Sequence, residues 1–144
     1  MSSGDLLKIK YDSNLLHFMN DFARITRAGL KDCFFDNNDL LTFVVPENDL
    51  GRAIGKRGFK VKLLEKATNR KIKILEFNSD PLIFIKNLVF PLKIAKAEHE
   101  GKIITLEAID SKTRGLLIGR AGINLRNYES VLKRYFDIEE LRVG

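Results

Sequence analysis

Cysteine, histidine and tryptophan are scarce in this 144-residue sequence, which has one cysteine, two histidines and no tryptophan. With Cys33 as the only cysteine, neither an intramolecular disulfide nor a cysteine-ligated zinc site can form. His17 and His99 are far apart in the sequence and do not show a metal-binding spacing. We therefore expect neither a metal ion nor another cofactor.

Long apolar runs are also lacking. The most apolar segment, PLIFIKNLVFPL (81–92), is interrupted by Lys86 and Asn87 and is shorter than the roughly 18 residues of a membrane helix. The N-terminal MSSGDLLKIK does not have the basic and then apolar order of a secretion signal. The expectation is a cytoplasmic protein without membrane contact.

The sequence lacks the motifs of common enzyme sites, with no Ser–His–acid or Cys–His grouping and no carboxylate pair suited to acid–base chemistry. In GRAIGKRG (51–58), three residues separate Gly51 from Gly55 where a P-loop has four, and Arg57 follows Lys56 where a P-loop has Ser or Thr. A dinucleotide-binding glycine turn would follow a strand, whereas these glycines lie between two predicted helices. We expect no enzymatic activity.

Positive charge is concentrated in two blocks. The net charge of the chain is +6, but residues 51–73 carry nine basic and one acidic side chain, and residues 112–134 carry six basic and one acidic. The remaining segments are all net negative. Such clustering is typical of a surface that binds a polyanion, although two solvated helix faces would produce it as well.

Both basic blocks contain the same glycine motif. A shift of 64 residues aligns GRAIGKRGFKV (51–61) with GLLIGRAGINL (115–125). The matched positions are Gly51, Ile54, Gly55, Gly58 and Val61 with Gly115, Ile118, Gly119, Gly122 and Leu125. One G-x-x-G is expected about once by chance at a glycine content of roughly 7%, whereas five matched positions indicate an internal repeat.

The segments around the motif repeat too, and they predict an α+β fold in which each half runs helix, strand, strand, helix, G-x-x-G turn, helix, strand. Longer helices are predicted at 13–29, 59–69, 81–90 and 123–136, and strands at 32–36, 39–45, 71–77, 92–100, 102–110 and 138–143. The junction before Pro81 divides the chain into domains 1–78 and 79–144, each with a small core.

Particular residues predict where helices begin and end. Gly29 is expected to end the first helix. Asn48 or Asp49, and Ser111 or Thr113, are the candidate N-caps of the short helices that lead into the two glycine turns.

A basic glycine turn between two helices is suited to binding phosphate. Glycine lets another backbone approach without a Cβ in the way, and the next helix directs its free N–H groups and positive dipole end into the turn. Lys56 and Arg57 add mobile positive charge at this place. A glycine that merely permits tight helix packing is the alternative, and the repeat and the charge pattern together favour a nucleic-acid site.

IGKRGFKV and IGRAGINL resemble the I-G-x-x-G-x-x-apolar signature of KH domains. In that family the loop clamps the backbone of about four nucleotides of a single strand. The predicted element order, with the extra helix and strand placed N-terminally, resembles the type II arrangement. Two such domains in tandem resemble the archaeal NusA-like transcription termination and antitermination factors. The resemblance implies two tandem type II KH domains, each with a three-stranded sheet packed on helices.

The resemblance also implies which residues bind RNA. In the first repeat they are Ile54, Gly55, Lys56, Arg57, Gly58, Phe59 and Lys60, and in the second Ile118, Gly119, Arg120, Ala121 and Gly122. For Phe59, stacking on a base and packing between the two domains are equal alternatives. Because Ala121 makes the second loop less basic, we expect the first repeat to contribute more phosphate contacts.

The implied function is a monomeric protein that binds single-stranded RNA during transcription elongation, termination or antitermination, with RNA polymerase as a further candidate partner. A ribosome-associated or scaffold KH protein, acting in small-subunit assembly or translation, is the alternative. The RNA sequence, the choice between RNA and single-stranded DNA, and the choice between termination and antitermination stay open.

Overall fold

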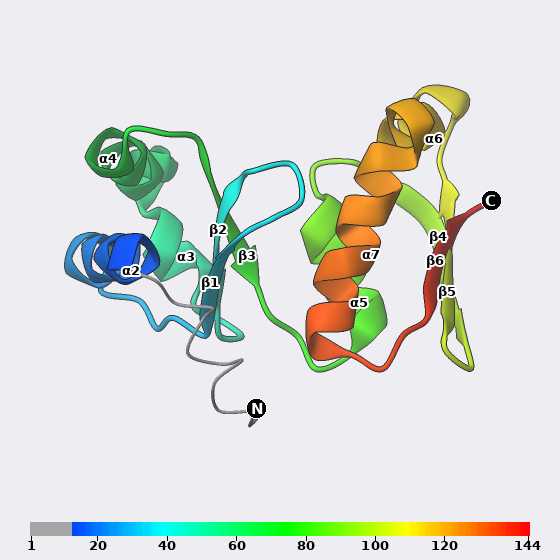
Figure 1. Ribbon diagram of the computed structural model, residues 1–144, viewed down its shortest axis with the longest axis horizontal. Coiled ribbons are helices and arrows are strands. Elements are labelled where there is room, and N and C mark those ends of the chain that lie inside the picture. The colour runs from blue at the N-terminus through cyan, green and yellow to red at the C-terminus, as the bar shows by residue number, and fades with distance from the viewer. Residues whose placement is uncertain (1–12) are drawn as a thin grey trace. The chain divides into compact units, whose positions relative to one another are not determined.

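The repeat in the sequence corresponds to a repeat of structure. The computed structural model describes residues 13–144, and along them the same order of helices and strands occurs twice (Figure 1). The described residues fall into two compact units, one up to Phe35 with Asp39–Phe77, the other Asp36–Asn38 with Asn78–Gly144. Each unit contains one three-stranded sheet and its helices, so the predicted α+β class is confirmed.

Among its described residues, the first unit starts with the amphipathic helix α2 and has its glycine loop between the helices α3 and α4. Its elements are α2 (Ser13–Thr26), β1 (Asp32–Phe35), β2 (Leu41–Val45), α3 (Leu50–Ile54), α4 (Phe59–Thr68) and β3 (Ile72–Glu76). The loop itself, Lys56–Gly58, forms a short 3-10 turn.

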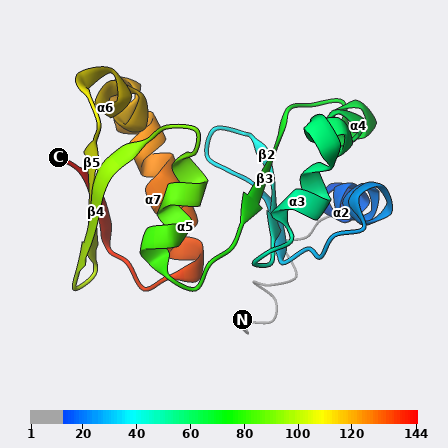
Figure 2. The same ribbon diagram turned by 180° about the vertical axis from the view of Figure 1, so that it is seen from behind.

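The second unit follows the same plan. Its elements are α5 (Pro81–Val89), β4 (Ile94–Glu100), β5 (Ile103–Ala108), α6 (Ser111–Ile118), α7 (Ile123–Tyr135) and β6 (Glu140–Val143). The second loop, Arg120–Gly122, is again a 3-10 turn between two helices. Helices α5 and α7 lie side by side against one face of the sheet, as both views show (Figures 1 and 2).

Sheet topology explains why the glycine loops occupy equivalent places. In each unit the first two strands are antiparallel, and the second and third are parallel neighbours. A tight turn places the next strand antiparallel to the first. For a parallel neighbour, the chain must first return to the same end of the sheet, and this requires a crossover connection. The helix–loop–helix segment supplies that crossover, α3 and α4 in one unit and α6 and α7 in the other. Each loop is therefore positioned by the same pair of parallel strands.

Aromatic side chains fill both cores. In the first unit, Phe22 and Phe43 are fully buried and stack with their ring centroids 4.7 Å apart. In the second, the buried ring of Phe84 meets Tyr135 and Phe136 edge to face, at 5.4 and 5.5 Å. These contacts join a helix to β2 in the first unit and α5 to the end of α7 in the second. The loops are thus mounted on packed, regular elements.

The predicted helix ends need correction. Helix α2 ends at Thr26, three residues before Gly29, and Arg27 takes the left-handed conformation that ends it (φ +57°). The Gly29 N–H instead donates to Asp49 Oδ2 at 2.8 Å, so this carboxylate makes a tertiary contact and does not cap α3.

The cap of α6 also differs from the prediction. Asp110, the residue before Ser111, caps the helix and accepts a hydrogen bond from the Thr113 N–H at 2.7 Å. This backbone hydrogen bond is the main reason that the pKa of Asp110 lies below its usual value. Both Ser111 and Asp110 are good N-cap residue types, and only the extended backbone at Asp110 decides between them.

Candidate nucleic-acid interface

The two glycine loops have the same backbone. Gly55, Arg57 and Gly58 have φ values of +75°, +54° and +73°, and the second-repeat counterparts Gly119, Ala121 and Gly122 have +74°, +54° and +75°. In each loop the second glycine's N–H donates to the first glycine's carbonyl at 3.1 Å. The G-x-x-G turn is therefore a defined structure that two different sequences adopt.

The first glycine of each loop is required by close packing. A Cβ at Gly55 would lie 2.6 Å from the Phe59 ring, and a Cβ at Gly119 would lie 2.7 Å from the side chain and 3.0 Å from the backbone N of Asn124. Their ψ values, 174° and 173°, combine with positive φ into a conformation that is essentially restricted to glycine. Substitution at these positions must distort the turn.

The second glycine of each loop faces open space. No heavy atom lies within 4 Å of a Cβ built at Gly58, and at Gly122 the nearest is Arg126 Nε at 4.0 Å. Both are in the left-handed α conformation. The side of the loop that these glycines expose leaves room for another molecule's backbone to approach.

The helices that follow the loops begin without a side-chain cap. Gly58 precedes α4 and Gly122 precedes α7, and neither helix start receives a side-chain hydrogen bond. In contrast, Asp80 and Asp110 cap α5 and α6. The first N–H of each helix is satisfied within the loop, since Phe59 donates to the Lys56 carbonyl and Ile123 to the Arg120 carbonyl. What each helix directs at the loop is therefore the positive end of its dipole, which attracts an anion.

Three cationic side chains stand at the loops. Lys56, Arg57 and Arg120 are exposed, and across residues 13–144 none of them is held in an ion pair or by a side-chain hydrogen bond. Ala121, which replaces the second cation in the other repeat, is exposed as well. At the two positions between the glycines, the first loop therefore offers two free positive charges and the second offers one, while Arg126 of α7, with Nε 4.0 Å from the Cβ position of Gly122, adds a cation beside the second loop.

Lys60 has a different environment from the one its sequence position suggests. Its ammonium donates to the carbonyls of Thr26 and Arg52, each at 2.8 Å. Asn124, its counterpart in the repeat, donates through Nδ2 to the Leu116 carbonyl at 2.9 Å. In each unit, this side chain therefore connects the helix that follows the loop to the helix that precedes it: Lys60 links α4 to α3, and Asn124 links α7 to α6. We assign Lys60 to holding the loop in shape, with two of its three donor hydrogens already used.

The apolar residues beside the loops are partly exposed. Ile54 and Ile118 are half-buried, while Phe59 and Ile123 keep 48% and 53% of their surface exposed. The Phe59 ring packs against Gly55, so one of its faces is used inside the loop. The exposed remainder gives each loop an apolar flank.

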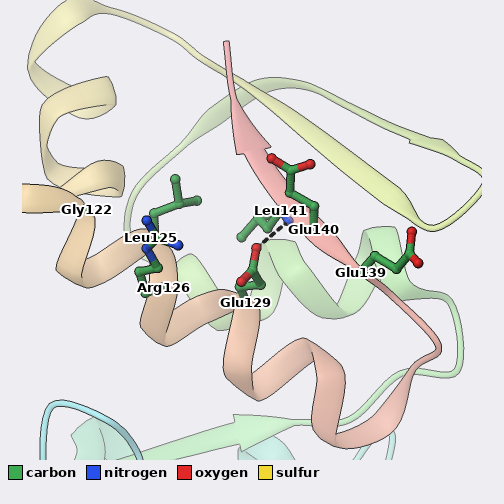
Figure 3. A pocket seen from close by; sticks show the side chains of 7 residues that line it. All are labelled: Gly122, Leu125, Arg126, Glu129, Glu139, Glu140 and Leu141. Atoms are coloured by element: carbon green, nitrogen blue, oxygen red, sulfur yellow. Dashed lines mark hydrogen bonds between the residues drawn. The ribbon is translucent and has the colours of Figure 1, made fainter.

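A groove opens beside the second loop, between α7 and β6 (Figure 3). Its volume is about 400 Å³, and it is lined by Gly122, Leu125, Arg126, Glu129, Glu139, Glu140 and Leu141. One of the three carboxylates, Glu129, accepts a hydrogen bond from the Leu141 N–H at 2.9 Å. A hydrogen bond from Arg142 lowers the pKa of Glu140, and the two side chains form an ion pair at 2.9 Å.

Sequence reasoning did not identify this groove. The net negative charge of residues 135–144 was a signal, but the glutamates come from α7 and from the segment at β6, which meet only in the fold. Two of these carboxylates are paired within the fold, Glu129 with Lys133 at 3.6 Å and Glu140 with Arg142 at 2.9 Å, and Arg126 lines the same groove, so the groove adds little net negative charge beside the second loop.

No metal or membrane feature accompanies the loops. The structure of residues 13–144 contains no group of three or more His, Cys, Asp or Glu side chains that could hold a metal ion. Over the same residues, every helix is too short or too polar to cross a membrane.

Comparison with known proteins gives relatives along almost the whole chain. No family model matches. Proteins named "Probable transcription termination protein NusA" are 29% identical in Methanocaldococcus jannaschii (96% of this chain, 76% of the relative) and 24% identical in Thermoplasma acidophilum (96% and 98%). The protein in "Crystal structure of APE1850" matches with a TM-score of 0.70 and 29% identity, over 90% of this chain and 96% of that one. The resemblance to archaeal NusA-like proteins is confirmed.

Proposed function

We propose that this chain, a relative of the archaeal NusA proteins, binds single-stranded RNA in transcription termination or antitermination through two tandem type II KH domains, residues 1–78 and 79–144. The observation that carries the proposal is the pair of glycine loops with one backbone conformation, each open at its second glycine and each followed by an uncapped helix. These features place the positive end of a helix dipole and mobile cationic side chains where a phosphate can approach.

Each loop would hold the RNA backbone in the same way. A phosphate is attracted by the positive dipole end of α4 or α7, and the mobile cations neutralise its charge: Lys56 and Arg57 in one loop, Arg120 in the other. The apolar flank at Phe59 or Ile123 is available to a base. Two cations against one at the positions between the glycines make the first loop the stronger phosphate site.

Two sites on one chain strengthen binding to an RNA that is long enough to reach both. Once one loop is occupied, the second binds at an effective local concentration set by the connecting RNA and protein. A nascent transcript is such a continuous single strand, and the relatives' name points to transcription. The proposal therefore includes nascent RNA and RNA polymerase as partners, in the cytoplasm, and no catalytic step by the protein itself.

The direct test is a binding titration with fluorescent single-stranded RNA, double-stranded RNA of the same sequence, and single-stranded DNA, each over a series of salt concentrations. We expect preference for the single strand, with log K falling by about 0.7 per phosphate neutralised for each unit of log salt. Preference for the duplex, or no binding at low salt, would contradict the proposal. Adding the protein to transcribing polymerase should then change termination in a manner that depends on the loop cations.

The helix glycines that precede the loops provide a further prediction. Gly51 and Gly115 lie one turn before Gly55 and Gly119, are exposed, and have open space where a Cβ would be. Nothing in the protein requires glycine there, yet glycine inside a helix costs about 1 kcal/mol relative to alanine. Close approach of the RNA backbone to the exposed side of α3 and α6 would explain why glycine stands at both positions although it lowers helix stability.

Replacing Gly115 by alanine is accordingly expected to stabilise the second unit by about 0.5–1 kcal/mol and to weaken RNA binding several-fold. Gly51→Ala should act in the same direction, with a smaller gain in stability because the residue is near the start of a short helix. Thermal melting and RNA titration measure the two effects on one sample. Unchanged RNA affinity in both variants would exclude contact at this face.

A further inference from the structure

The end of helix α2 brings a cation to the first loop from a distant part of the sequence. Lys60 Nζ, two residues past Gly58, donates to the Thr26 carbonyl at 2.8 Å, and Arg27 is the next residue. Arg27 therefore lies beside the N-terminal turn of α4, although it precedes Gly58 by 31 residues in the sequence. The Lys60 ammonium also neutralises the negative end of the α2 dipole, which would otherwise oppose a phosphate there.

The segment that carries Arg27 is held in place on both sides. The Ala28 N–H donates to Thr26 Oγ1 at 3.1 Å, and the Gly29 N–H donates to Asp49 Oδ2 at 2.8 Å. Arg27 is held in the left-handed region, at φ +57°, where glycine or asparagine is the usual residue. A long cationic side chain is thus kept at a position whose backbone would favour a smaller residue.

Arg27 is also free to contact a ligand. It is exposed, and no carboxylate among residues 13–144 pairs with its guanidinium. The neighbouring Arg24 is already paired with Asp21 at 3.0 Å. The two arginines line a shallow hollow of about 580 Å³ on α2, together with Asn20, Ala23 and Ala28. The small side chains of Ala23 and Ala28 leave space in this hollow for an RNA backbone.

The second unit has no counterpart of this arrangement. The 64-residue shift places Pro91 where the first unit has Arg27, and Asn124 where it has Lys60. Asn124 reaches the Leu116 carbonyl of α6, the counterpart of only one of the two carbonyls that Lys60 contacts. The cation at the end of the first helix is therefore a property of the first unit alone.

We infer that the C-terminal end of α2 is an additional phosphate-binding surface, where Arg27 contacts the RNA backbone next to the nucleotides held by the first loop. The inference rests on the proposed RNA binding and extends it to residues outside the glycine motif. The RNA-binding surface of the first unit would then extend beyond the glycine loop and helices α3 and α4. Free charge, fixed position and the adjacent hollow all favour a backbone contact over a base-specific one.

The test measures the salt dependence of binding to a single-stranded RNA of about ten nucleotides for four proteins: the parent, Arg27→Asn, Arg27→Lys and Lys86→Asn. Asparagine tolerates positive φ, so the first variant removes charge without disturbing the turn, and Arg27→Gly serves as a second variant of this kind. Lys86 is exposed in the last turn of α5 and is the matched control for net charge.

We expect Arg27→Asn to lower the slope of log K against log salt by about 0.7, corresponding to one phosphate contact, while Arg27→Lys and Lys86→Asn retain the parent slope. Three results would overturn the inference. The salt slope could be unchanged in Arg27→Asn and Arg27→Gly, it could be lowered in Arg27→Lys as well, or it could fall equally in Lys86→Asn. If a double variant with Lys56→Asp and Arg57→Asp still loses affinity in that case, RNA binding at the loop stands. If that variant also binds normally, the proposed function itself fails.

Discussion

Changing Lys56 and Arg57 together to aspartate is expected to weaken binding of single-stranded RNA by at least about 100-fold, since hydrogen bonds to charged groups are each worth roughly 1.5–3 kcal/mol and two are lost. The new carboxylates would also repel the phosphate at the start of α4. The slope of log K against log salt should fall by about 1.4, because two phosphate contacts disappear. Fluorescence anisotropy with labelled RNA measures both quantities.

The fold should survive this change. Both side chains are exposed, and neither is bound to another side chain of the described residues. Arg57 has φ +54°, and aspartate is among the residues that tolerate positive φ best. The melting temperature should therefore stay close to that of the parent protein, and a loss of affinity can be assigned to the loop.

The corresponding change at Arg120 and Ala121 is the matched control. It removes only one positive charge, that of Arg120, where the first variant removes two. We expect a smaller loss of RNA affinity than in the first loop. A larger loss would reverse the order of the two loops, and normal binding by both double variants would exclude the backbone clamp.

The second large effect is expected on stability, from Gly119→Ala. The glycine-restricted φ and ψ cost about 1–3 kcal/mol for alanine, and overpacking against Asn124 adds a similar amount, so we expect a destabilisation of roughly 2–6 kcal/mol. The backbone N of Asn124, 3.0 Å from the new Cβ, cannot move aside without shifting the start of α7. The hydrogen bond from Asn124 to the Leu116 carbonyl would be lost with it.

Gly122→Ala, three residues away, is the control for this effect. Gly122 also has positive φ, but the nearest atom to its Cβ position is 4.0 Å away. A left-handed alanine without a clash costs about 1–2 kcal/mol. Urea or thermal unfolding of the two variants should therefore separate them clearly, with Gly119→Ala the less stable. Equal stabilities would show that the close packing around Gly119 is not maintained in solution.

Local patterns were sufficient to predict the elements of both units. Alternating and helical periodicity located every strand and longer helix, with ends within a few residues, because burial on one face imposes the same period on any sequence. The 64-residue repeat predicted that the two loops would share a conformation, and their φ values agree within 2°. Helix ends were less certain, since Asp49 and Asp110 are equally good caps in isolation.

The roles of individual polar side chains depended on the tertiary structure. Lys60 belonged to a basic cluster in the sequence, but the fold places two carbonyls within its reach. The glutamates beside Gly122 come from different elements, so no local motif could reveal their groove.

The sequence by itself determined that this protein has two α+β repeats, each with one glycine loop, and that positive charge gathers at those loops. The repeat, the periodicity and the composition are properties of the sequence, and they can be determined without knowledge of the tertiary contacts between residues. The tertiary structure alone decided that the two cations of the first loop stay free while Lys60 holds helices together, and that the end of α2, next to Arg27, comes within reach of Lys60. Such partnerships depend on how helices pack, which brings together residues that no sequence period relates.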